Sequence, residues 1–155
     1  MLIVSIALVL VALAYFVTTT LVDLRPLNNV TAASPRERRT EVLVNVPLLL
    51  VPAVLLVLGG LLDQVWPVYA GAGAEAVAAL GGLALWWLPY LVGVTVPWAT
   101  AGAGTSWAEL HARTYAHTII VLPRIGDRPR PNLEHMILHS LFLAAAVTGF
   151  IAAAG

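Results

Sequence analysis

The four histidines are the side chains best suited to acid–base or metal chemistry, and all of them lie in the last 45 residues. His135 and His139 form an H-x-x-x-H pair, which on a helix shares one face about one turn apart. Such a pair serves as an acid–base pair near neutral pH or as two ligands of a metal ion. A metal would need a third ligand, for which Glu109, His111 and Asp23 are the candidates. The simpler alternative is a pair hydrogen-bonded to backbone, Thr or Asn groups across helices.

Two further sets of polar residues recur at helical spacing. Glu41 and Asn45 are four residues apart and share a helical face. Glu109, Arg113 and His117 recur every fourth residue. This second set is either a solvent-exposed face with salt bridges or a stripe facing other helices. In the second case Glu109 would orient His117, and Arg113 would bind an anionic group.

Two adjacent tryptophans, Trp86 and Trp87, fall in the middle of an apolar run. Gly81-Gly82 before them and Pro89 after them allow a kink. A cavity with such an aromatic wall suits a lipophilic substrate, whereas the alternative role of the two rings is simple packing.

The elements that must position these residues are predicted by the distribution of charge. Of the 155 residues 60% are hydrophobic and 10% are charged, with no net charge and a mean hydropathy of +0.90. This composition excludes an ordinary soluble domain, and the lack of excess positive charge argues against nucleic-acid binding. The absence of cysteine excludes thiol chemistry and sulfur-ligated metals. Four long uncharged stretches remain, each sufficient to cross ~30 Å of hydrocarbon.

We therefore expect an all-α polytopic membrane protein, a four-transmembrane-helix bundle that forms one domain over residues 1–155. The expected membrane helices cover about residues 2–22, 42–62, 77–98 and 133–153. No charged residue falls in the middle of any of these four ranges.

The arginines predict the orientation. Four lie between the first and second spans and four between the third and fourth, whereas residues 63–75 carry acids and no base. By the positive-inside rule both arginine-bearing segments are cytoplasmic, so both termini lie outside. The expected location is the bacterial cytoplasmic membrane, with Trp66 and Tyr69 in the outer interfacial belt and Trp98 and Trp107 in the inner one.

Capping signals refine the segments between the spans. Ser34-Pro35 with Glu37 is typical of a helix start, and Asn132 is suited to cap the fourth helix. Ser106 and Glu109 form a second capping box, which predicts an amphipathic interfacial helix on the cytoplasmic side over about residues 106–122. Residues 67–74 are expected to form a tight outer turn, and residues 101–104 a flexible link.

In size, helix number and polar inner face the chain resembles the eicosanoid and glutathione membrane-enzyme superfamily. That superfamily carries an Arg-x-x-x-Asn-x-x-Glu motif at the start of its second helix. Here Glu41 and Leu48 stand at the arginine and glutamate positions around Asn45. The resemblance therefore implies an architecture and transfers no catalytic residue.

The function expected from these patterns is a membrane-embedded enzyme that performs acid–base chemistry on a lipid or isoprenoid-like substrate at a polar cytoplasmic face. The candidate catalytic residues are His135, His139, Glu109, Glu41 and Asn45. The candidate substrate-binding residues are Arg113, His117, Trp86, Trp87 and Asp23. A non-catalytic subunit of a larger membrane complex is the alternative. A small transporter, which would have to oligomerise, is disfavoured because transporters place a charge at the middle of the bilayer. Membrane lipids, a lipophilic small molecule and further copies of the chain are the expected partners, and the sequence identifies no cofactor.

Overall fold

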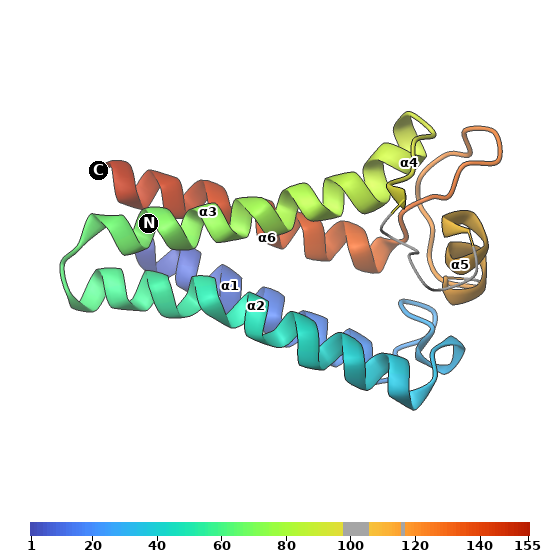
Figure 1. Ribbon diagram of the computed structural model, residues 1–155, viewed down its shortest axis with the longest axis horizontal. Helices are drawn as coiled ribbons and strands as arrows, with labels where there is room; N and C mark the ends of the chain where they lie inside the picture. The colour runs from blue at the N-terminus through green and yellow to red at the C-terminus, as the bar shows by residue number, and fades with distance from the viewer. Residues whose placement is uncertain (98–105, 116) are drawn as a thin grey trace.

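The computed structural model describes residues 1–97, 106–115 and 117–155, and within these ranges every regular element is a helix (Figure 1). Four long helices form the body: α1 (Leu2–Leu21), α2 (Pro35–Leu61), α3 (Val65–Gly82) and α6 (Leu133–Ala154). α3 continues through a π-helical turn, η2 (Leu83–Trp87), into α4 (Leu88–Leu91). Counting this continuation, all four are long and apolar enough to cross a membrane. The two remaining elements are the short helices η1 (Val30–Ala32) and α5 (Trp107–Thr114).

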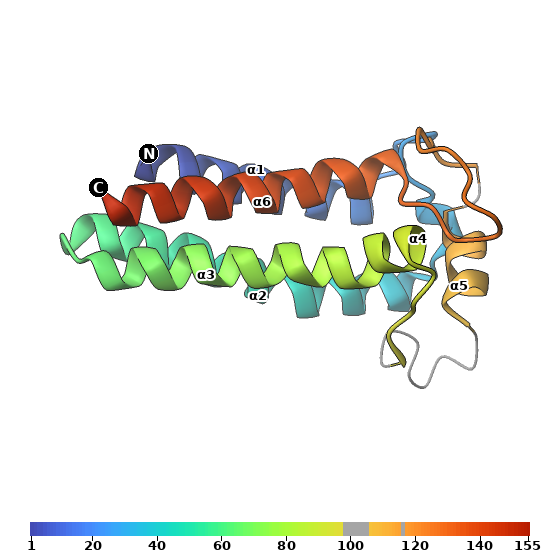
Figure 2. The same cartoon turned by 90° about the horizontal axis from the view of Figure 1, so that it is seen from above.

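The long helices form a bundle in which each packs against two others. α1 contacts α2 and α6, and α3 likewise contacts α2 and α6 (Figures 1 and 2). Both chain termini and the α2–α3 turn lie at one end, which we call the hairpin end. The remaining connections and α5 lie at the opposite end. We call this the arginine end, since all eight arginines are in or beside these connections.

Small residues allow the helices to approach closely in the hairpin half. A Cβ added at Gly149 would lie 2.9 Å from Ala72 Cβ and 3.0 Å from Ser5 Oγ. Ser5 also donates a hydrogen bond of 2.9 Å to the Ala145 carbonyl, which links α1 to α6. Small residues thus allow α1, α3 and α6 to pack closely in this half of the bundle.

The outer surface of the bundle is apolar along its length. Large aliphatic side chains project from all four long helices, with Ile3 82%, Leu61 77%, Val77 70% and Leu143 58% exposed. A soluble monomer rarely exposes so many large apolar side chains, and this surface is compatible with an integral membrane protein.

All three capping predictions are confirmed. Ser34 and Glu37 form a reciprocal capping box at the start of α2, and Ser106 and Glu109 form another at the start of α5. The Asn132 side chain accepts a hydrogen bond from the His135 backbone N–H at the start of α6. These caps satisfy backbone donors that would otherwise lack partners.

The third helix differs from the range 77–98 predicted for it. It begins at Val65 after a short turn and ends at Leu91, so the predicted tight turn at 67–74 is wrong. Gly71 lies in the helix because it packs under Leu56 and the Pro52 carbonyl, a contact that outweighs the low helix propensity of glycine. Beyond Leu91, Gly93 has a φ of +80° and ends the helix. Trp98 and the link at 101–104 lie outside the described residues.

The earlier start of α3 also changes the position of an acid. Glu75 lies ten residues inside α3 and is fully buried. The prediction that no charged residue lies in the middle of a long helix is therefore wrong, since Glu75 lies within α3 and not at the boundary of a loop.

The helix predicted over 106–122 is also shorter, since α5 ends at Thr114. The β-branched run from Thr118 to Val121 disfavours helix, and His117 has a φ of +64°. In place of a helix, the backbone of Ile119 forms two long-range hydrogen bonds. Its N–H donates to the Pro26 carbonyl, and its carbonyl accepts from the Leu133 N–H. α5 is thereby tied to the loops that follow α1 and precede α6.

Candidate functional site

An aromatic and imidazole cluster centred on Trp86 occupies the arginine end. The indole of Trp86 stacks on the His135 imidazole with ring centroids 3.7 Å apart and an interplanar angle of 29°. Tyr115 lies edge-on at 4.7 Å and His111 at 5.0 Å. One buried ring, 7% exposed, therefore joins the third membrane-length helix to α5 and α6.

The π-helical turn explains how two adjacent tryptophans both reach histidines. Pro89 has no N–H to donate within the helix, which favours a local widening of the turn. In an α-helix adjacent side chains point about 100° apart, and a wider turn reduces this angle. Trp86 stacks on His135, while Trp87 Nε1 donates a hydrogen bond of 3.3 Å to His139 Nδ1.

The hydrogen bonds of Asn132 assign the proton on His135. The side-chain oxygen of Asn132 accepts the His135 backbone N–H at 3.2 Å and lies 2.8 Å from His135 Nδ1. Since this oxygen only accepts hydrogen bonds, Nδ1 carries the proton in the neutral ring. The Nε2 atom of His135 is then a lone-pair base.

The opposite assignment holds for His139. Indole N–H groups only donate, so the Trp87 hydrogen bond requires an unprotonated Nδ1 on His139. Its neutral ring therefore carries the proton on Nε2 and is a donor there. The ring lies directly against Gly82, where an added Cβ would be 2.6 Å from His139 Nε2.

Both histidines line a cavity of about 550 Å³ between the helices, which we call the central cavity. Glu41, Asn45 and Trp86 line the same cavity. Four of the five predicted catalytic residues, His135, His139, Glu41 and Asn45, therefore line one cavity. His139 and Trp87 also line an apolar groove of about 490 Å³ between α3 and α6, formed mainly by alanine, leucine and other apolar side chains.

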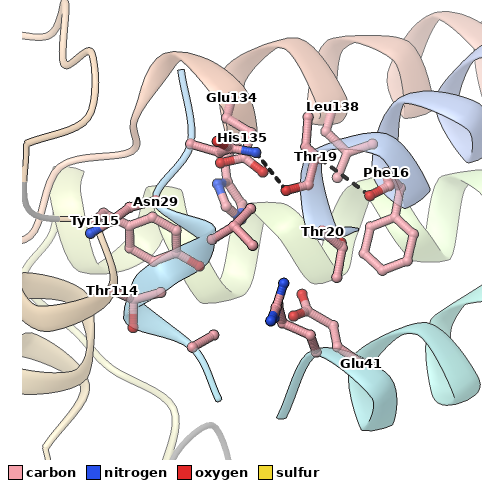
Figure 3. A pocket seen from close by; sticks show the side chains of 14 residues that line it. Phe16, Thr19, Thr20, Asn29, Glu41, Thr114, Tyr115, Glu134, His135 and Leu138 are labelled. Atoms are coloured by element: carbon pink, nitrogen blue, oxygen red, sulfur yellow. Dashed lines mark hydrogen bonds between the residues drawn. The ribbon is translucent and has the colours of Figure 1, made fainter. Parts of the chain in front are cut away.

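A smaller polar cavity of about 70 Å³ adjoins this site (Figure 3). Glu41, Tyr115, Glu134 and His135 surround it. Burial raises the pKa of the Tyr115 phenol well above its ordinary value, and the carboxylates of Glu41 and Glu134 raise it further. Tyr115 is therefore a neutral hydrogen-bond donor at physiological pH.

Other predicted site residues lie elsewhere. Glu109 caps its own helix, accepting hydrogen bonds from the Ser106 backbone N–H and side-chain hydroxyl. Arg113 forms an exposed ion pair of 3.7 Å with Glu37, and His117 lies beyond the end of α5. The predicted stripe of Glu109, Arg113 and His117 therefore does not form, because the helix is too short to contain it.

Asp23 also lies away from the histidines. Its carboxylate accepts hydrogen bonds from the Arg25 guanidinium, which lower its pKa, in an exposed ion pair of 2.9 Å. Tyr115 and Glu134 also line this end of the bundle but are not among the residues predicted from the sequence. The adjacency of Glu134 and His135 was a usable signal, whereas the role of Tyr115 depends on contacts between distant segments.

The described part of the chain contains no group of three His, Asp or Glu side chains placed to hold a metal ion. Comparison with known proteins gives no assignment either: no family model matches, and neither curated proteins nor solved structures provide a significant match.

His111 predicts a pH dependence of α5 docking. It is 6% exposed, and burial lowers its pKa from 6.5 to about 4. The undocked state binds the proton more readily, so docking stability is constant above about pH 6.5 and falls as the pH decreases toward 4. The protection factors of the α5 amides, which are exchange rates corrected for the intrinsic effect of pH, should fall over this window in the wild type. In His111→Phe, which retains an aromatic ring, the fall should be much smaller. Equal falls in the wild type and in His111→Phe would contradict this role.

Proposed function

We propose that the chain is an integral membrane protein whose arginine end carries an acid–base site for a lipophilic substrate. The observation that carries the proposal is the complementary protonation of two histidines on one cavity. His135 Nε2 is a base and His139 Nε2–H is a donor, with ring centroids 5.8 Å apart. A single polar group of a substrate can contact both rings at this separation.

In this proposal each imidazole is held in its working tautomer by a neighbour. Asn132 keeps the proton of His135 on Nδ1, and stacking on Trp86 fixes the ring plane. Trp87 keeps Nδ1 of His139 unprotonated. His135 would accept a proton from the substrate, while His139 Nε2–H would donate a hydrogen bond to the developing negative charge.

The apolar surroundings favour a lipophilic substrate. His139 lines both the central cavity and the outer groove between α3 and α6. The groove is apolar apart from Trp87, His139 and Ser140 at one end. A molecule dissolved in the bilayer could therefore reach His139 without crossing water.

The catalytic proposal is tested with purified protein in lipid nanodiscs supplied with a total lipid extract. Mass spectrometry should detect a lipid consumed and a lipid formed by the wild type. In His135→Gln turnover should fall roughly 10²-fold or more, since general acid–base catalysis contributes at least this factor. Identical lipid profiles for the wild type and His135→Gln would reject catalysis and favour the accessory-subunit alternative.

The proposed insertion makes a separate prediction about orientation. With the arginines cytoplasmic, both termini and the α2–α3 turn face outward in the bacterial cytoplasmic membrane. Alkaline phosphatase fused after Gly155 should be active, and green fluorescent protein at this point should be dark. The same reporters fused after Asp127, at the arginine end, should give the reverse pattern. A fluorescent fusion after Gly155 would contradict the orientation.

A further inference from the structure

The deep part of the central cavity contains a buried acid that the proposed acid–base chemistry does not use. Glu75 is 0% exposed, and among the residues that the structure describes neither of its carboxyl oxygens has a hydrogen-bond partner. It lines the central cavity, as do Pro52, Ala78 and Phe142. Buried polar groups are paired in the great majority of cases, so a carboxyl group with two unpaired oxygens requires an explanation.

The depth of Glu75 increases the cost of leaving it without a partner. It lies ten residues beyond Val65, about 15 Å along the helix at a rise of 1.5 Å per residue. This is the middle of a ~30 Å hydrocarbon layer. Acidic groups at such depth face a cavity and mark binding sites, because neither lipid nor an apolar core solvates them.

We propose that Glu75 binds the positively charged group of a lipophilic organic cation, such as a protonated amine, within the central cavity. A cation would supply the partner that both carboxyl oxygens of Glu75 lack among the described residues. The central cavity, at about 550 Å³, has the size of a small-molecule site. The rings of Phe16 and Phe142 on the cavity wall favour the same ligand class, since aromatic faces attract cations.

Glu75 lies in a different part of the central cavity from the two histidines, which line the same cavity. Trp86 is eleven residues further along the same helix, roughly 16 Å toward the arginine end. The proposal requires the cavity but not catalysis at His135. An acid in the middle of a membrane-length helix is also a feature expected of transporters. Glu75 would recognise a cation in the same way whether the protein transports the cation or only binds it.

The test uses the full chain in nanodiscs and two ions of the same shape and opposite charge. Tetraphenylphosphonium should bind the wild type, and tetraphenylborate should not. Glu75→Gln, which preserves shape, should weaken tetraphenylphosphonium binding at least tenfold. Asp63→Asn removes one acid from the α2–α3 turn outside the cavity and should leave the affinity unchanged. Cation binding and lipid turnover are measured separately, so failure of the catalytic proposal and failure of this one are distinguishable.

A second measurement needs no variant. A lipophilic carbodiimide should modify Glu75 of the wild type, and tetraphenylphosphonium should protect the residue, as read by peptide mass spectrometry. Absence of tetraphenylphosphonium binding, equal binding by Glu75→Gln, or modification of Glu75 without protection would each overturn the proposal.

Discussion

Replacement of Trp86 by alanine is expected to destabilise the arginine end more than any other single truncation. Truncation of a buried tryptophan to alanine lowers the free energy of unfolding by about 3–5 kcal/mol, because the surrounding side chains do not fill the large cavity that is left. Trp86 is 7% exposed and contacts His111, Tyr115 and His135, which come from α5, the segment after it and α6. Its loss removes the contact that these three segments share.

The control for this variant is Trp66→Ala. Trp66 is on the same membrane-length helix but is 64% exposed, so its truncation leaves no internal cavity. In nanodiscs the thermal midpoint should fall by several degrees for Trp86→Ala and by much less for Trp66→Ala. The His135 ring protons should also lose the ring-current shift from the stacked indole. Equal midpoints for the two variants would show that the cluster does not stabilise the fold.

The positions of three long helices could be predicted from the sequence because charged residues lie outside them. The ranges 2–22 and 133–153 agree closely with α1 and α6, and the predicted second span lies within α2 apart from its last residue. The other acids that flank the predicted spans lie at or near the ends of long helices, but Glu75 lies inside α3. A carboxyl group that faces an internal cavity can lie within an apolar helix, and local composition does not distinguish that case from a loop.

The candidate site could be predicted in part. His135 and His139 share a face of one helix by their spacing, and Glu41 and Asn45 share a face of another. The four residues then line one cavity because the first turns of α2 and α6 lie at the same end of the bundle. The stacking of Trp86 could not be predicted. It depends on a π-helical turn and on α5 folding back over the bundle, both of which are set by contacts between distant segments.

Replacement of Gly82 by alanine is expected to inactivate the proposed site while leaving the bundle folded. The added Cβ would lie 2.5 Å from His139 Cδ2 and 2.6 Å from Nε2, distances that real Cβ atoms do not tolerate. The imidazole is a side chain that can rotate away, so the helices need not move. Its displacement breaks the hydrogen bond from Trp87 Nε1 and releases the tautomer that this bond fixes.

Gly81→Ala provides a closely matched control. It is the preceding residue of the same helix, and a Cβ there meets no atom within 4 Å. Alanine also has a higher helix propensity than glycine, so this variant should be as stable as the wild type or slightly more so. Both variants should therefore show thermal midpoints close to that of the wild type.

The difference between the two glycine variants should appear in function and in the hydrogen bond. In Gly82→Ala the indole N–H resonance of Trp87 should shift, and lipid turnover should fall about 10²-fold, the effect of displacing a catalytic group by about 1 Å. Gly81→Ala should change neither. If Gly82→Ala kept full turnover with a shifted indole resonance, His139 would be a packing residue and not the donor of the proposed site. If the indole resonance did not move, the helices would have separated instead, and the position of the His139 ring would not depend on Gly82.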